Sequence, residues 1–406
     1  MNSSKNKYID YIFIVLLLLN GGSVLKTLGF TAILQFVTAL IMLLCLLLNG
    51  RILIHKTGIT LIFLIFGFLV LNSFHYLLFD LDSFFSNQFL NFIVLICIGV
   101  FVGNQFLNRS NSFIYRLEKV LKFFIIHGIL SCLIISFFPT KNILFEEIGG
   151  GSAYVGYFNV FFQRIHVIYT GELDDTLKNI LGFDFYRAHG IFWESGVFAF
   201  FVNIYVFINF FIFKKLKSIK YSLPAILLSW STTGIIIFAI QSFVFLKDYK
   251  RGNKQVLIRK YLFGFLGLSF VLFAVFQNFN NKVYGDDAGS AAQRYADTVG
   301  ALSVISNFPL LGIGVDFQNL SKKLTTASFN FDNTIGSNFK DLNKDDIKLS
   351  NSFLRAFIYF GIPVGLILIY AIYKQRLIPH KRWLFFLITV LSVSSVPVLF
   401  LGFYFS

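Results

Sequence analysis

The chain has 406 residues, of which 56% are apolar and only 14% are charged, and 55 of them are phenylalanine. Soluble domains are typically about 45–50% apolar and about 25% charged, so this composition excludes an ordinary soluble protein. The net charge of +15 does not indicate a nucleic-acid partner, because the basic residues gather between apolar runs, as in the cytoplasmic loops of membrane proteins.

The N-terminal part, residues 1–138, is predicted to be transmembrane. Several of its apolar runs exceed 18 residues, which is long enough to cross about 30 Å of hydrocarbon as a helix. Their continuous apolarity predicts helices and excludes barrel strands. We therefore expect an all-α, polytopic membrane protein with about ten to twelve spanning helices. The first five are expected at 9–20, 28–48, 58–79, 89–107 and 121–138.

A first large loop is expected after Pro139 and covers residues 139–189. It contains three consecutive glycines and a stretch rich in tyrosine and phenylalanine. The positive-inside rule places this loop outside the cytoplasm. Central helices follow over 190–276. The first is expected over roughly 190–213 and ends at a lysine-rich stretch, and the last is expected near 261–276.

The segment Tyr221–Leu246 is too short for two full spans, yet basic residues flank it on both sides. Both flanks therefore favour the cytoplasm. We predict a hairpin of two short helices over 221–246, with the polar stretch Ser229–Gly234 forming the turn near Thr232. A polar turn at that depth must be buried in protein or line a wet cavity. The alternative interpretation is one ordinary span.

The second large outer loop is expected at 277–350 and is rich in polar residues in its second half. Within it, Arg294–Pro309 alternates apolar and polar positions at helical spacing, which predicts an interfacial helix. The C-terminal part, residues 351–406, holds two further apolar segments, 351–373 and 383–404.

Polar residues of the types that catalyse reactions or bind substrates lie close together where the first loop is expected to meet the membrane. Arg187, His189 and Glu194 place a cation, an imidazole and a carboxylate within a short stretch. Arginine can bind phosphate through two parallel hydrogen bonds. The alternative for Arg187 and Trp193 is an interfacial anchor. Glu194 is harder to explain in this way, because a carboxylate one turn into a span is costly unless it is paired or used.

Two further clusters belong to the second loop and its end. Arg294 is followed by Gly312 and Gly314, and the glycines permit a tight turn. Asn351 and Arg355 open the next helix, where Asn351 could also be a simple helix cap.

Ionisable residues inside the predicted spans are nearly absent, with His75 and His127 as the exceptions, and this disfavours an ion-coupled transporter. Asp80 and Asp82 have the spacing of a metal-binding pair, but two acids in a short loop are usually just solvated. The sequence holds no Cys/His metal set, phosphate-binding loop or dinucleotide motif. We therefore expect no metal site and no cofactor.

In combination, these clusters resemble the O-antigen polymerase and O-antigen ligase family of bacterial inner membranes. The resemblance covers roughly residues 180–375 and rests on an ordered set of short pieces. These pieces are Arg187 with Gly190–Glu194 ahead of Phe198-Ala199, then Arg294 with Pro309–Gly314, then Asn351–Leu354 with Phe360-Gly361.

The resemblance implies a metal-independent glycosyltransferase of the C-type architecture that polymerises undecaprenyl-pyrophosphate-linked oligosaccharides into O-antigen or capsular polysaccharide. It implies an active site on the outer face of the bacterial inner membrane, with a flippase and a chain-length regulator as pathway partners. The catalytic candidates are then Arg187, Arg294, Glu194 and His189. The substrate-binding candidates are Asn351, Arg355, Arg164, Gly312 and Gly314.

Two departures from the family pattern affect this interpretation. Ligases carry a histidine where this chain has Ser350, which favours a polymerase over a ligase. The family often has an arginine in the stretch that corresponds to Ser231–Gly234, and this chain has none there. A ligase, or a flippase for the same lipid-linked glycan, remains the alternative.

Overall fold

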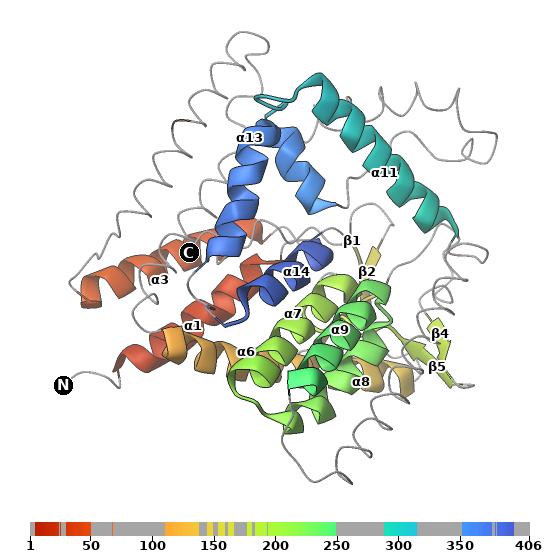
Figure 1. The fold of residues 1–406 in the computed structure, drawn as a ribbon. Helices are drawn as coiled ribbons and strands as arrows, with labels where there is room; N and C mark the ends of the chain where they lie inside the picture. Colours follow the sequence, from red (N-terminus) through yellow and green to blue (C-terminus); the bar gives the residue numbers. More distant parts are fainter. Residues whose placement is uncertain are drawn as a thin grey trace. The chain divides into compact units, whose positions relative to one another are not determined.

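The computed structural model describes residues 5–23, 25, 30–49, 67, 110–137, 144–148, 153–158, 161–165, 177–180, 183–192, 194–248, 288–314, 351–375, 378 and 380–393 (Figure 1). This part of the chain is mainly helical, as the sequence predicts. It forms two compact units, Met1–Ile41 with Asn111–Phe279, and Met42–Ser110 with Asn280–Ser406.

The first unit contains α1 (Lys5–Asn20), the part of α3 (Thr31–Asn49) up to Ile41, and α6 (Ser110–Phe137) from Asn111 onward. Asn20 fixes α1 to α3, because its side-chain nitrogen donates to Thr38 Oγ1 at 2.7 Å. Thr38 is fully buried and donates in turn to the carbonyl of Leu34 at 2.6 Å. These bonds satisfy polar groups that would be costly to bury alone.

Part of the segment 139–189, predicted as the first large outer loop, is β structure. An antiparallel sheet has the strand order β1 (Leu144–Ile148), β2 (Ala153–Phe158), β3 (Phe161–Ile165). A second antiparallel pair joins β4 (Leu177–Ile180) to β5 (Phe183–Tyr186). Aromatic and β-branched residues favour strands. These short strands are an addition to the predicted all-α class, in a chain whose described part is otherwise mainly helical.

The centre of the first unit is α7 (Ser195–Phe207), which continues as the π-helix Ile208–Ile212. The sequence analysis starts this helix near residue 190, but it begins at Ser195. Nearly all of its side chains are buried, and α8 (Ile219–Ser229) and α9 (Thr232–Asp248) pack against it (Figure 1). A helix that is apolar on every side must be enclosed by other elements or by lipid.

The predicted break within 221–246 is confirmed, because α8 ends and α9 begins at a turn on Trp230. Trp230 adopts a left-handed conformation with φ 48°. Ser231 then caps α9, since its Oγ accepts a hydrogen bond from the backbone N–H of Gly234 at 3.2 Å. Ser229 and Ser231 are both buried. The non-helical backbone is therefore enclosed in protein, as the physical argument requires.

A buried amide network holds α9 to α7. Asn203 donates to the carbonyls of Ala199 and Gly234, at 2.9 and 3.0 Å. Gln241 donates to the side-chain oxygen of Asn203 at 2.9 Å. Gly234 permits the close approach, because a Cβ there would lie 2.6 Å from the Cβ of Ala199.

Replacing Asn203 with leucine is expected to destabilise this unit by about 1–3 kcal/mol. It removes the shorter of the two hydrogen bonds that Gln241 donates to Asn203, and it removes the donor to the buried carbonyl of Gly234. The thermal unfolding midpoint of the purified protein should fall. The double variant Asn203→Leu/Gln241→Leu should recover part of the loss, since it removes both polar partners. A midpoint that is unchanged in Asn203→Leu would contradict the importance of the network.

The second unit contains α11 (Ala288–Asn307), α13 (Ser352–Lys374) and α14 (Arg382–Val393). The predicted helix over 294–309 is thus present, although it starts earlier. The predicted span over 351–373 is not one regular helix, because Gly361 interrupts α13 with φ 76° and ψ 172°. Figure 1 shows the two halves of α13 meeting at an angle.

Two helices in the described part are long and apolar enough to cross a membrane, judged by length and composition: Ser195–Ile212 and Phe353–Lys374. The core helix of a soluble protein can meet the same criterion. The predicted spans at 58–79 (Gly67 apart), 89–107 and 261–276 lie outside the described residues.

Candidate functional site

Arg187 lies against the C-terminal end of α8. Its Nε and Nη2 donate to the carbonyls of Ser229 and Trp230, both at 3.4 Å. The backbone N–H of Ala188 donates to the carbonyl of Leu228 at 2.8 Å. The carbonyls at a helix C-terminus lack partners within the helix and carry partial negative charge, so a cation is favourable there. The two guanidinium bonds are long, so they hold the side chain in place only weakly.

The turn that follows fits closely against α6. Gly190 has φ 61°, and a Cβ there would lie 3.2 Å from the Cα of Gly128. The backbone N–H of Phe192 donates to the carbonyl of His189 at 3.1 Å, and Phe192 forms an isolated bridge with Ser23. The Phe192 ring also stacks on Phe201, with 4.6 Å between centroids. The segment that carries Arg187 and His189 is thereby held by α6, by α7 and by Ser23.

Glu194 occupies a different position from the one the sequence analysis expects. It is the N-cap residue of α7, with extended backbone at φ −146° and ψ 145°, and not a residue one turn inside the helix. The side chain is partly exposed. Negative charge is favourable at a helix N-terminus, so the helix dipole offsets part of the cost of this carboxylate.

His189 is only 4% exposed, whereas Glu194 remains partly accessible. A group that takes a proton from a substrate must reach it within hydrogen-bond distance. Of these two candidates, Glu194 therefore has the better access.

In the second unit, a turn at the end of α11 inserts into the break in α13. The backbone N–H groups of Ile313 and Gly314 donate to the carbonyls of Ile358 and Tyr359, at 2.8 and 3.0 Å. In return, the N–H of Ile362 donates to the carbonyl of Pro309 at 2.7 Å. The turn thus satisfies backbone groups that the broken helix leaves without helical partners.

The glycines of this junction are needed for its geometry. Gly312, Gly314 and Gly361 have φ of 67°, 81° and 76°. A Cβ on Gly312 would lie 2.6 Å from the carbonyl carbon of Tyr359. The buried backbone of Gly312 and Gly314 gives both residues a structural role, in addition to the substrate-binding role that the resemblance implies.

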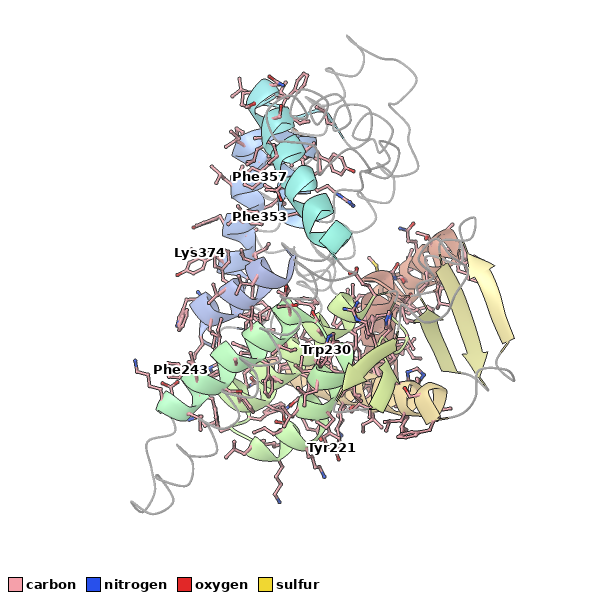
Figure 2. The ribbon with its side chains drawn as sticks, turned by 90° about the vertical axis from the view of Figure 1, so that its right-hand side faces the viewer. Tyr221, Trp230, Phe243, Phe353, Phe357 and Lys374 are labelled. Carbon is pink, nitrogen blue, oxygen red and sulfur yellow. The ribbon has the colours of Figure 1, made fainter. Side chains whose placement is uncertain are left out.

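Asn351 caps α13. Its side-chain oxygen accepts from the backbone N–H groups of Phe353 and Leu354, at 3.0 and 3.1 Å. Arg355 follows in the first turn and is partly buried. Figure 2 shows Phe353 and Phe357 on the same helix, and their ring centroids lie 5.4 Å apart. The capping interpretation of Asn351 is confirmed.

Two other candidates are placed by their backbone. Arg294 lies on α11 and Arg164 lies on β3, where it pairs with Val155 of β2. The side chains of both arginines lie outside the described atoms, as do Trp193, Asp80 and Asp82. Arg187 and Arg294 belong to different units, so their convergence on one cavity stays a prediction.

An ion pair joins Asp10 on α1 to Arg116 on α6, and the sequence pattern did not predict it. Asp10 is only 2% exposed, so an ionisable residue does lie within the first predicted span. Burial lowers the pKa of the Arg116 guanidinium below its ordinary value, but arginine side chains stay protonated in proteins. The sequence does contain a signal for this ion pair, because an acidic residue within an expected span, such as Asp10 in 9–20, needs a partner.

The described residues offer a cation at the C-terminal end of α8, a carboxylate at the start of α7 and a backbone junction in a broken helix. Among them, no group of three or more His, Cys, Asp or Glu residues could hold a metal ion. No family model, no curated protein and no solved structure matches the chain.

Proposed function

We propose that this chain is a membrane-embedded glycosyltransferase that polymerises oligosaccharides linked to a polyprenyl pyrophosphate. The observation that supports it best is that pieces of the family-like motif set meet in space. The turn Pro309–Gly314 and the break at Gly361 are joined by three backbone hydrogen bonds, although about 50 residues separate them. Two of the three motif pieces therefore lie at one structural junction.

Broken helices favour a polar substrate site in a membrane protein. Non-helical backbone at membrane depth is stable only where protein encloses it or where it lines a cavity, and such breaks often mark binding sites. The chain has one break at Trp230 and another at Gly361. The first places carbonyl groups against Arg187, beside the segment that leads to Glu194.

A membrane location is further supported by apolar side chains that face outward. One stripe of α3 exposes large apolar residues at helical spacing, and soluble proteins seldom expose such a continuous patch. These residues are Ile33, Phe36, Leu40, Leu43 and Leu44. The second half of α13 likewise exposes Leu366 and Tyr370.

The proposed chemistry uses the residues named above. A sugar hydroxyl of one lipid-linked unit attacks the anomeric carbon of another, and the pyrophosphate leaves with its lipid. Arg187 and Arg294 stabilise the charge that develops on the pyrophosphate, as fixed cations do in transition states. Glu194 accepts the hydroxyl proton. No divalent metal is required, because the pyrophosphate is already a good leaving group.

Deletion of the gene followed by gel analysis of surface glycans tests this function. A polymerase deletion leaves a single repeat unit on the acceptor in place of a ladder. A complete loss of glycan from the acceptor would favour a ligase or a flippase, and an unchanged ladder would refute all three.

The positive-inside rule predicts that both large loops lie outside the cytoplasm. Single cysteines at Ser152 and Ser328 should therefore react with a membrane-impermeant maleimide in intact cells. A cysteine at Lys247, on the predicted inner side, is the matched control and should react only after permeabilisation. Labelling of either loop position only after permeabilisation would refute the topology.

A further inference from the structure

A basic and aromatic cluster lies away from the candidate site, at the other end of α8. It is formed by α6, the link between the π-helix and α8, and the first turn of α8. Its members are Tyr115, Lys119, Lys122, Phe213, Lys215, Lys220 and Tyr221. Figure 2 shows Tyr221 at the opposite end of α8 from Trp230.

Four lysines lie over aromatic rings within this cluster, and two of them share one ring. The ammonium nitrogens of Lys122 and Lys220 lie 4.8 and 4.7 Å from the same ring centroid, that of Tyr221. Lys119 lies 4.4 Å from the ring centroid of Tyr115, and Lys215 lies 4.9 Å from that of Phe213. Aromatic faces attract cations, and each such contact holds a flexible lysine in place.

Two contacts connect the members of the cluster. The rings of Tyr115 and Phe213 meet edge to face, with centroids 6.5 Å apart, which brings Lys119 and Lys215 together. Lys119 and Lys122 lie three residues apart on α6 and are therefore neighbours on its surface. A hydrogen bond to Lys119 lowers the pKa of Tyr115, and the charge of Lys215 lowers it further. Of the acidic residues, Glu118 lies near Tyr115 and Lys119. The ammonium groups thus outnumber this carboxylate and attract an anion.

We propose that this cluster binds the phosphate headgroup of an anionic phospholipid. The proposal rests on the membrane location proposed above. Lysines at a membrane surface are attracted to anionic lipids, and basic pockets between helices bind their headgroups.

Neighbouring apolar residues favour a lipid over free phosphate. Phe123 lies one turn after Lys119 on α6 and is 65% exposed, and Leu216 follows Lys215 in the chain and is 36% exposed. Exposed apolar side chains near Lys119 and Lys215 suit acyl chains that continue from a bound headgroup. A free phosphate ion has no apolar part that could contact either side chain.

Native mass spectrometry of the full-length protein in uncharged detergent tests the proposal. Phosphatidylglycerol should bind more tightly than phosphatidylcholine with the same acyl chains. The double variant Lys122→Gln/Lys220→Gln should weaken phosphatidylglycerol binding by about fivefold per lysine, while phosphatidylcholine binding should not change. The matched control is Lys247→Gln, an exposed lysine at the end of α9, which should behave as the wild type does.

Other outcomes would overturn the proposal. Equal binding of the two lipids by the wild type, or an equal loss in Lys247→Gln, would show that the cluster does not select the headgroup. Displacement of the lipid by millimolar inorganic phosphate would identify free phosphate as the ligand. If the double variant does not fold, wild-type selectivity that persists in about 0.5 M salt would count against the lysines. A chain recovered only in the soluble fraction would instead refute the membrane location itself.

Discussion

Replacing Arg187 with alanine is expected to reduce glycan chain growth on the order of 100- to 1,000-fold, the usual effect of removing a group that stabilises charge in a transition state. Arg294→Ala should have an effect of the same size, if both arginines face one pyrophosphate. Each variant is measured as polymer ladder formation by membranes that contain equal amounts of the protein. Lysine should restore activity only partly, because it lacks the planar fork that matches phosphate oxygens.

A structural role of Arg187 must be separated from this effect, because its guanidinium donates to the carbonyls of Ser229 and Trp230. Ser231→Ala is a matched control. It removes the N-cap of α9 at the same turn, at a cost of about 1 kcal/mol, and leaves the cation in place. If Ser231→Ala and Arg187→Ala lose activity and thermal stability equally, Arg187 is a structural residue. Full activity of Arg187→Lys would support the interfacial-anchor interpretation.

Replacing Gly312 or Gly361 with alanine is expected to destabilise the second unit by about 2–5 kcal/mol. A left-handed conformation costs an L-residue about 1–2 kcal/mol, and forcing atoms into a packed site costs about 1–3 kcal/mol more. At Gly361 the new Cβ would lie 2.9 Å from the backbone nitrogen of Leu311. The yield of folded protein and its unfolding midpoint should both fall.

Gly67→Ala provides the matched control for these variants. Gly67 also belongs to the second unit, and a Cβ there would meet no atom within 4 Å. Alanine is favoured over glycine in a helix by up to about 1 kcal/mol, so this variant should be as stable as the wild type or more so. Equal midpoints for Gly67→Ala, Gly312→Ala and Gly361→Ala would contradict the role of the interlocked turn.

The sequence by itself determined the helical segments and one break between them. Long apolar runs predict α1, α3, α6, α7 and α14 because a local excess of apolar residues needs no knowledge of distant contacts. The break at Trp230 was predictable for a different reason. Basic residues on both flanks of Tyr221–Leu246, together with a polar centre, do not suit one uninterrupted helix.

The tertiary structure alone decided how the candidate residues are used. Local pattern indicated that Gly312 and Gly314 allow a turn, but not that this turn would pair with the carbonyls of Ile358 and Tyr359. It showed Asn351 as a possible cap, and the two hydrogen bonds to α13 made that role definite.

Three other features of the structure also depend on contacts between distant parts of the chain, which a local sequence pattern does not reveal. The sequence around Gly361 is continuously apolar, and such a run looks the same whether the helix is straight or broken. The strands within 139–189 depend on pairing between segments, which single-segment propensity describes poorly. Asp10 is acceptable in the first predicted span because Arg116, more than 100 residues away, neutralises it. A partner that far along the chain is found only when the fold brings the two side chains together.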